Sequence, residues 1–382
     1  MRIAFVTPYF YPAFEYGGTP RVAYDFARGL VRRGHQVTVF TTDSGGRKRI
    51  AGPHKQCVDG IQVFYYSNLS NALAYNQRVF VPLRFFSDIG RHLSSFDVIH
   101  IHEFRNFVTV GAHSALRQGN IRYVLSPHGG LQRLGKDFLK KLFDRFWGKR
   151  ILAEAAAICA VSSLELEDAK HFGVPEEKLI LLPNPIDDAH YATLPARGAF
   201  SRKWNLDGKR IVLFLGRLIW IKGIDVLLDA FRLLDNIANL HLAIAGADDG
   251  AESALRARGA GNVTFTGFLN DVEKLQALVD SEIVVVPSRR EGFPGTALEA
   301  LAAAKPVVLS SMCGTIPPIP ELAATGIFES ENAQDLARQL RQFLECPLNP
   351  GLLLEARSVV LQNFSTDALA RKAEDLYRSI IT

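Results

Sequence analysis

The sequence predicts an α/β protein made of two parallel-sheet units in tandem. Apolar runs of strand length alternate with amphipathic segments of helix length through most of its 382 residues, a pattern that is typical of parallel sheets covered by helices. The pattern restarts after Pro183-Asn184-Pro185. A chain of this length is expected to form two or three domains, each with enough residues to bury a core.

The first unit is expected over residues 1–185. Its first helix should run from about Pro20 to Arg33, because Gly34 follows as a helix end signal. The segment from Arg47 to Cys57 is polar and contains glycine, which predicts a loop. The expected strands are Ile3–Thr7, Gln36–Thr41, Ile61–Phe64, Val98–His102, Tyr123–Ser126, Ala157–Val161 and Leu179–Leu182.

The second unit is expected over residues 186–365, after a polar connector that ends at Gly208. Helices are expected near Gly223–Leu234, Val272–Val279 and Pro294–Ala303. The expected strands are Ile211–Leu215, Leu240–Ala245, Val263–Thr266, Ile283–Val286 and Val307–Leu309.

Composition narrows the class of protein. Hydrophobic residues make up 48% and charged residues 22% of the chain, as in ordinary soluble proteins. No apolar run reaches the roughly 20 residues that a membrane span requires. The apolar start, Met1 to Val6, meets Pro8 without a small-residue cleavage site, so we expect a strand and not a signal peptide. The cysteines are widely spread and predict neither a disulfide framework nor a structural zinc site. They are Cys57, Cys159, Cys313 and Cys346. Together with the absence of a signal-peptide pattern, they lead us to expect a cytoplasmic protein.

The net charge of +5 is unevenly distributed. Residues 1–185 carry 24 Lys and Arg against 15 Asp and Glu, whereas residues 186–382 carry 20 against 24.

The segment Leu131–Arg150 alone holds seven Lys and Arg against two Asp. Its apolar residues recur at helical spacing, so it is either a basic helix on an anionic membrane surface or a surface helix packed on the core. The cations expected to face a membrane or acceptor are Arg133, Lys136, Lys140, Lys141 and Arg145. Nucleic-acid binding is not expected, because no recognition motif accompanies the charge.

The segment from Arg289 to Pro306 carries the most specific pattern. Glu291 follows the buried strand Ile283–Val286, and Glu299 lies about one turn into the helix that begins near Pro294. Ligands of open α/β sheets bind at this edge, and a helix start favours an anion. The combination suggests a nucleotide-sugar site. A glycosidase carboxylate pair is the alternative, but it does not explain the phosphate-binding features.

Two cations are expected at the corresponding edge of the preceding strand. Arg217 follows Gly216 at the end of a strand, and Lys222 precedes a helix beside flexible Gly223. Together they could clamp a diphosphate. The alternative is that both are solvated surface cations.

The first unit offers a glycine pair and several histidines. Gly17 and Gly18 stand at the first helix start, where backbone N–H groups could approach a phosphate or the loop could simply be flexible. His128 follows a strand and could contact a leaving phosphate or sugar hydroxyl, or pack as a capping residue. His100 and His102 share a strand face without companion ligands, so a metal site is not expected. The sequence lacks the G-x-G-x-x-G and G-x-S-x-G motifs.

Taken in order, these motifs resemble the retaining glycosyltransferases of family 4, which have the GT-B architecture. The likeness rests on Gly216-Arg217 with Lys222-Gly223, and on Glu291-Gly292-Phe293-Pro294 followed by Glu299-Ala300. Gly17-Gly18, His128-Gly129, Ser162 through Glu167 and Pro183 through Asp187 fit the same pattern, so that the resemblance covers nearly the whole chain.

The resemblance implies two Rossmann-like domains facing across a cleft. Residues 1–185 would bind the acceptor, residues 186–365 the donor, and a helix in residues 366–382 would cross back to the first domain. The implied donor is a UDP- or GDP-linked hexose, with no metal or other cofactor. The implied acceptor is a lipid-linked glycan or polysaccharide of the cell surface, reached from the cytoplasm or the inner membrane face. A nucleotide-sugar epimerase and a non-catalytic sugar-nucleotide-binding protein are the alternatives.

The resemblance also implies roles for single residues. Arg217 and Lys222 would bind the donor diphosphate and stabilise it as it leaves. Glu291 would bond the transferred sugar, near His128, and Glu299 would bond the ribose. The remaining donor contacts would come from Gly17, Gly18, Gly216, Phe293, Pro294, Gly295 and Thr296.

Overall fold

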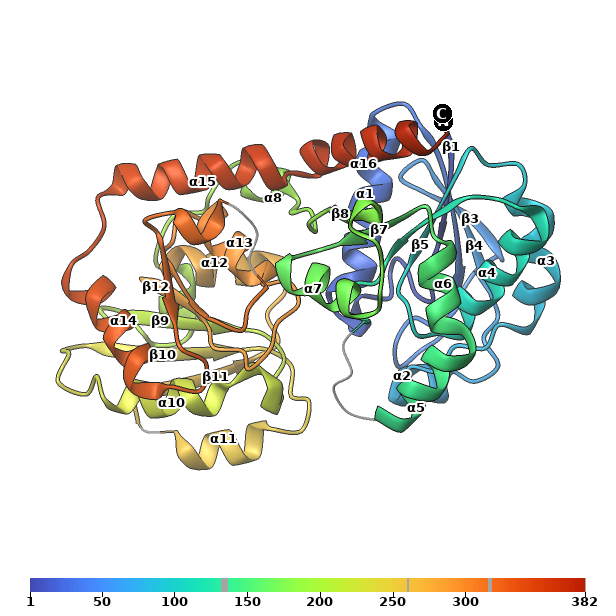
Figure 1. Ribbon diagram of the computed structural model, residues 1–382. Helices are drawn as coiled ribbons and strands as arrows, with labels where there is room; N and C mark the ends of the chain where they lie inside the picture. The colour runs from blue at the N-terminus through green and yellow to red at the C-terminus, as the bar shows by residue number, and fades with distance from the viewer. Residues whose placement is uncertain (132–136, 260, 315–317, 382) are drawn as a thin grey trace. The chain divides into compact units, whose positions relative to one another are not determined.

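The computed structural model describes residues 1–131, 137–259, 261–314 and 318–381. The chain forms two compact units (Figure 1). Unit 1 comprises Met1–Pro185 together with the C-terminal segment that begins at Thr366, and unit 2 comprises Ile186–Ser365.

Unit 1 is built on an eight-stranded sheet in the order β3-β4-β2-β1-β5-β6-β7-β8. All neighbouring strands are parallel except β3, which pairs antiparallel with β4. The strands are β1 (Arg2–Val6), β2 (Gln36–Thr42), β3 (Lys55–Val58), β4 (Ile61–Tyr66), β5 (Val98–His102), β6 (Tyr123–Ser126), β7 (Ala157–Ala160) and β8 (Leu179–Leu181).

The prediction of a loop over Arg47–Cys57 is wrong at the end of that range, because β3 begins at Lys55. Asp59 and Gly60 connect β3 to β4 with φ values of 47° and 80°. Two adjacent residues with positive φ make the tight turn that suits a hairpin, and this turn lets a polar segment pair with β4.

Helices cover both faces of the first sheet (Figure 1). One face packs on α1 and the C-terminal α16, and the other packs on the remaining helices of the unit, so that two hydrophobic clusters lie on opposite sides of the sheet. The helices are α1 (Gly18–Arg32), α2 (Asn71–Gln77), α3 (Leu83–Leu93), α4 (Phe107–Gly119), α5 (Asp137–Phe143), α6 (Lys149–Glu154), α7 (Ser163–His171) and α16 (Thr366–Ile381).

The docking of α16 on unit 1 depends on a close approach to α1. A Cβ atom at Gly29 would lie 2.9 Å from the Cβ of Ala370 and 2.9 Å from Cγ2 of Thr366. Arg33 of the C-cap then ion-pairs with Glu374 at 2.7 Å. The last helix is therefore part of unit 1.

Unit 2 is built on a six-stranded sheet in the order β11-β10-β9-β12-β13-β14, and all its strand pairs are parallel. The strands are β9 (Arg210–Leu215), β10 (Leu240–Ala245), β11 (Val263–Gly267), β12 (Ile283–Val286), β13 (Val307–Ser310) and β14 (Thr325–Phe328). The helices are α8 (Asp188–Tyr191), α9 (Ala199–Lys203), α10 (Ile224–Arg232), α11 (Glu252–Arg258), α12 (Asp271–Asp280), α13 (Gly295–Ala302), α14 (Ala333–Glu345) and α15 (Pro350–Phe364).

Both sheets confirm the predicted α/β class. In each, the strand order reverses beside the first strand of the unit, between β1 and β5 in unit 1 and between β9 and β12 in unit 2. Such a reversal is the topological switch point, outside which open α/β sheets bind their ligands.

Candidate functional site

The switch point of unit 2 brings together the loops that follow β9 and β12. Gly223, at the start of α10, has a φ of 63°, and a Cβ atom there would lie 2.0 Å from the carbonyl oxygen of Pro287. Only glycine allows this approach of the two loops. The approach brings Lys222, in the short helical turn Trp220–Lys222, beside the loop that carries Glu291.

Lys222 and Glu291 form an ion pair across these loops. The Lys222 ammonium donates to Oε2 of Glu291, and the Ser288 hydroxyl donates to the same oxygen at 3.3 Å. The Glu291 backbone is also held, because its N–H donates to the carbonyl of Met312 at 3.1 Å and its carbonyl accepts from the N–H of Gly314 at 2.7 Å. The side chains of Lys222 and Glu291 are 22% and 19% exposed. They are therefore fixed, yet open to a ligand.

Arg217 lies two residues beyond β9 and pairs with Asp249 at 2.7 Å. The two side chains are 52% and 47% exposed. Exposed ion pairs contribute only about 0–1 kcal/mol to stability, so a phosphate could displace Asp249 from Arg217 at a small cost in free energy.

Helix α13 begins at the carboxyl edge of β12, one residue from the predicted start. It starts at Gly295 after Pro294, with no side chain hydrogen-bonded at its N-cap. Thr296 donates its hydroxyl to the carbonyl of Leu215 at 3.4 Å, which ties this helix start to the end of β9. A helix start without a side-chain cap offers N–H groups to an anion.

Glu299, within α13, is paired with a residue that sequence reasoning missed. Lys274 of α12 donates to Oε1 of Glu299 at 2.5 Å. Lys274 also lies 3.8 Å from Asp271 of its own helix. The sequence around Lys274 does not predict its contact with Glu299, because this contact depends on how α12 and α13 pack.

Arg289 is committed to contacts within unit 2. Its guanidinium bonds both oxygens of Asp225, at 2.9 and 2.8 Å, and stacks 4.4 Å from the centroid of Trp220. A further bond reaches Glu331 at 2.9 Å. These contacts show that Arg289 stabilises the turn that carries Trp220.

In unit 1, the glycine pair Gly17-Gly18 borders open space. Gly17 has a φ of 109°, and α1 begins at Gly18. A Cβ atom at either position would meet nothing within 4 Å. The backbone of this junction is therefore accessible to a ligand.

His128 follows β6 and contacts a second histidine. Its Nε2 lies 2.9 Å from Nδ1 of His102, and burial lowers the pKa of His128 to about 4. Its imidazole is therefore neutral near pH 7 and can take part in hydrogen bonds without a charge.

His100 and His102 lie inside the sheet. His100 bonds the Tyr377 hydroxyl of α16 at 2.6 Å and the Ser126 hydroxyl at 2.7 Å. Burial lowers the pKa of both histidines, to about 3 for His100. Within the described residues, no group of three or more His, Cys, Asp and Glu side chains is arranged to hold a metal ion.

The loop after His128 is fastened by a buried carboxyl group. The N–H of Gly129 donates to Oε1 of Glu165 at 2.5 Å, and the N–H of Val161 donates to Oε2 at 2.8 Å. Burial raises the pKa of Glu165 to about 7. This carboxyl group holds the His128-Gly129 turn in place.

A polar cluster at the unit 1 switch point was also missed by sequence reasoning. Tyr9, after β1, donates its hydroxyl to Glu103, after β5, at 2.5 Å. Burial raises the pKa of Glu103, whereas bonds from Tyr9 and Thr19 and the charge of Arg78 oppose the rise. The available signal was a carboxylate directly after the strand Val98–His102, at the edge where ligands bind.

The basic segment divides its apolar residues between core and solvent. Leu131 is buried and Phe143 packs on the core. Phe138 and Phe146, in contrast, are 75% and 60% exposed, so the interpretation as a helix packed on the core is wrong for them. The other exposed apolar residues of the segment are Leu139, Leu142 and Trp147.

The same segment turns at Asp144–Gly148, one turn of π-helix between α5 and α6. Arg105 holds that turn through two bonds to Asp144, both at 2.9 Å. Lys141 and Arg145 are exposed and Lys140 is half-buried, whereas Arg133 and Lys136 lie outside the described residues. None of the helices in the described ranges is long and apolar enough to cross a membrane.

Family models match both halves of the chain. Residues 16–190 match the model described as Glycosyltransferase Family 4, and residues 197–358 match that of Glycosyl transferases group 1. An uncharacterised glycosyltransferase of Methanocaldococcus jannaschii is 27% identical over 99% of this chain and 98% of its own length. The O-antigen chain mannosyltransferase C of Escherichia coli is 28% identical over 81% of this chain and 79% of its own.

Solved structures show the same fold. The structure of Anabaena HepE in complex with UDP and glucose has a TM-score of 0.77 at 17% identity, over 99% of this chain and 100% of that one. Sucrose-phosphate synthase of Thermosynechococcus elongatus has a TM-score of 0.76 at 19% identity, over 100% and 99%. Two Rossmann-like domains of this kind make up the GT-B fold. The chain belongs to glycosyltransferase family 4.

Proposed function

We propose that this glycosyltransferase moves a hexose, with retention, from a UDP- or GDP-linked donor to a lipid-linked or polysaccharide acceptor. The observation that carries the proposal is the Lys222–Glu291 pair, set beside Arg217 and the start of α13 at the unit 2 switch point. Unit 2 would bind the donor, and unit 1 the acceptor.

Relatives support this choice of substrates by their names. One is the E. coli O-antigen chain mannosyltransferase. Another is a Campylobacter jejuni N-acetylgalactosaminyltransferase, named for a diphospho-undecaprenol acceptor and 29% identical over 58% of this chain and 60% of its own length. Cell-surface glycan synthesis is therefore the proposed process.

The proposed reaction breaks the bond between the sugar C1 and the diphosphate oxygen, which leaves with the electron pair. The acceptor hydroxyl oxygen forms the new bond to C1 on the same face, and its proton passes to the leaving phosphate oxygen. Negative charge develops on the diphosphate, where Arg217, Lys222 and the N–H groups of α13 would stabilise it. These groups supply positive charge without a metal, so activity should survive a chelator.

The carboxylates would hold the two ends of the donor. Glu291 would accept bonds from hydroxyls of the transferred sugar, and Glu299 from the ribose. Their present partners, Lys222 and Lys274, neutralise them before the donor arrives. Arg217 and the uncapped start of α13 give the same switch point phosphate-binding features that a glycosidase does not need, which favours transfer over the glycosidase alternative.

A thermal-shift panel of nucleotides and nucleotide-sugars tests this proposal. A ligand at about 100 times its Kd raises the unfolding free energy by about 2.7 kcal/mol, so the preferred base and sugar should stand out. Lys222→Ala should lose most of the shift. No shift with any nucleotide would refute the donor assignment.

Incubation with donor alone separates the alternatives. A changed sugar that is still attached to its nucleotide would identify an epimerase. Binding without turnover against every acceptor would identify a non-catalytic binding protein. Released nucleotide and glycosylated acceptor support the transferase.

We further propose that the exposed face of α5 and the π-turn rests on the anionic inner membrane surface. Exposed Phe138 and Phe146 would enter the interface while Lys141 and Arg145 meet lipid phosphates. Each cation contributes about 1 kcal/mol at such a surface, so changing both to Glu should weaken binding by at least about 30-fold. Co-sedimentation at low salt, with vesicles about one-third phosphatidylglycerol in phosphatidylcholine, measures this. The control reverses Lys48 and Arg91, exposed cations outside this face, and equal binding of both variants would refute the assignment.

A further inference from the structure

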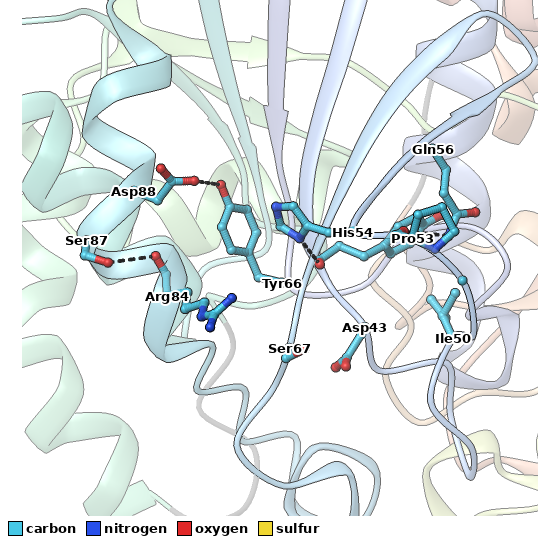
Figure 2. A pocket seen from close by; sticks show the side chains of 12 residues that line it. Asp43, Ile50, Pro53, His54, Gln56, Tyr66, Ser67, Arg84, Ser87 and Asp88 are labelled. Atoms are coloured by element: carbon cyan, nitrogen blue, oxygen red, sulfur yellow. Dashed lines mark hydrogen bonds between the residues drawn. The ribbon is translucent and has the colours of Figure 1, made fainter.

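Unit 1 contains a second candidate binding site, away from the β1–β5 switch point. A cavity of about 500 Å³ opens at the carboxyl edge of β2 and β4 (Figure 2). Its walls come from the residue after β2, from the end of β4, from the loop before β3 and from α3. Its volume falls within the range of about 300–1,000 Å³ that small-molecule sites occupy. The side chains that matter below are Asp43, His54, Tyr66, Ser67, Arg84 and Asp88.

Both carboxylates of the cavity are held in place by other residues. Asp43 accepts two bonds from Nη1 of Arg49, at 2.9 and 2.7 Å, and one from the N–H of Asn68 at 2.8 Å. Asp88 accepts from the Tyr66 hydroxyl at 2.7 Å, a bond that lowers the pKa of Asp88. Each carboxylate is therefore oriented before a ligand arrives, and each has further lone pairs to accept from hydroxyl groups.

Arg84 supplies the complementary donors. It lies one turn before Asp88 on α3, and Figure 2 shows its side chain extending toward Tyr66 and Ser67. Among the residues that the structure describes, none hydrogen-bonds or ion-pairs with the Arg84 guanidinium. Five N–H donors at the wall of a cavity are thus available to a ligand.

Aromatic rings complete the wall. The rings of His54 and Tyr66 meet edge to face, with centroids 4.8 Å apart and an interplanar angle of 82°. Nδ1 of His54 lies 2.5 Å from the Tyr65 carbonyl, which fixes the ring. Fixed carboxylates, a guanidinium and rings in one cavity match a ligand that carries many hydroxyl groups on an apolar ring, which is a sugar.

The cavity is connected to the glycine junction of the same unit. The residue after Asp43, Ser44, hydrogen-bonds the Tyr16 hydroxyl at 2.5 Å. The N–H of Arg47 donates to Oε2 of Glu15 at 3.0 Å. The segment that borders the cavity is thereby fastened to the residues just before Gly17. A ligand in the cavity would lie along the sheet edge that also carries the switch point of unit 1.

We propose that this cavity binds sugar units of the acceptor glycan beyond the unit that receives the new sugar. The proposal rests on the proposed function, in which unit 1 binds a glycan acceptor. It predicts that longer acceptors bind more tightly than short ones, and that Arg84, Asp88 and Asp43 carry the difference.

Ligand-observed NMR on the full chain tests the proposal without turnover. The probes are trisaccharides of mannose, glucose, galactose, N-acetylglucosamine and glucuronic acid, with inorganic phosphate as a further arm. Arg84→Ala should weaken binding of the preferred trisaccharide by about tenfold or more, the loss of about one charge-assisted bond. Asp88→Asn should weaken the same trisaccharide. Arg91→Ala, an exposed arginine of the same helix that does not line the cavity, is the matched control and should bind as the wild type does.

The outcomes separate this proposal from the proposed function. Trisaccharide binding that falls in Arg84→Ala and not in Arg91→Ala supports the subsite, provided that both variants unfold at the wild-type temperature. Binding of phosphate alone, or of trisaccharides equally in both variants, would overturn it. If nucleotide-sugars stabilise the chain and no trisaccharide binds, the subsite fails and the donor assignment stands. If no nucleotide stabilises the chain, the donor assignment itself fails.

Discussion

Replacement of Lys222 by alanine tests the catalytic assignment most directly. The change removes one cation at the unit 2 switch point and breaks its ion pair with Glu291. If Lys222 serves the leaving diphosphate, transfer should collapse while the fold persists.

The magnitude follows from the position of the charge. The Lys222 ammonium already touches a carboxylate that would face the donor sugar, and its side chain is 22% exposed. A unit charge about 4 Å from a phosphate charge, at an effective dielectric constant of about 20, contributes about 4 kcal/mol. That energy corresponds to a loss of about 10³-fold in kcat/KM. Loss of the ion pair itself should lower the free energy of unfolding by only about 1 kcal/mol, because solvent screens a pair that is exposed to this extent.

Initial rates at several donor concentrations, together with thermal unfolding, measure both effects. Lys203→Ala is the matched control, because Lys203 pairs with Glu273 at 2.5 Å outside the switch point. The control should lose ion-pair stability and keep its transfer rate.

A double-mutant cycle with Glu291→Gln distinguishes two roles of Lys222. If Lys222 acts only by holding Glu291, its removal should cost nothing further in the Glu291→Gln background. If it contacts the diphosphate, most of the loss should persist there. A kcat/KM of Lys222→Ala within about tenfold of the wild type would refute the reasoning.

Three further predictions concern the donor site, the C-terminal helix and acid stability. Asp249→Asn should tighten UDP or GDP binding by up to about fivefold in titration calorimetry, because the exposed ion pair that competes for Arg217 contributes about 0–1 kcal/mol. Gly29→Ala should lower the unfolding free energy by about 1–3 kcal/mol in urea, because its Cβ would lie 2.9 Å from Ala370 and force α16 outward. His100→Gln should reduce the loss of stability between about pH 7 and pH 5 by about 2 kcal/mol, because the pKa of His100 is near 3 in the fold and about 6.5 when unfolded.

The sign of the histidine effect follows from its lowered pKa. The unfolded chain binds a proton at His100 below about pH 6.5, and the folded chain does not until the pH approaches 3, so stability falls as pH falls. An unchanged pH dependence in His100→Gln would contradict this account. Weaker nucleotide binding by Asp249→Asn would show that Asp249 orients Arg217 instead of competing for it. For Gly29→Ala, the control is Gly90→Ala, whose Cβ would meet Ala115 at an ordinary 3.6 Å, and equal effects of the two would contradict the close-approach argument.

The sequence alone predicted the elements whose signal is local. Four predicted strands match the structure at both ends, because a strand buried in a parallel sheet is a continuous apolar run. They are Val98–His102, Tyr123–Ser126, Leu240–Ala245 and Ile283–Val286. The sequence did not predict the short strands β3 and β14, since each lies at a sheet edge and is only partly buried. The sequence also placed Arg217, Glu291 and His128 in loops directly after strands, because the apolar runs that precede them could be recognised as strands.

Only the tertiary structure decided which of these residues meet. It paired Lys222 with Glu291 and Lys274 with Glu299, and it brought Tyr9 to Glu103, contacts that span 69, 25 and 94 residues of sequence. It also exposed Phe138 to solvent, although helical spacing alone allowed it to face the core. The physical reason is the same in each case. Apolar periodicity is written in neighbouring residues, whereas the partner of a charged or aromatic side chain depends on how distant elements pack.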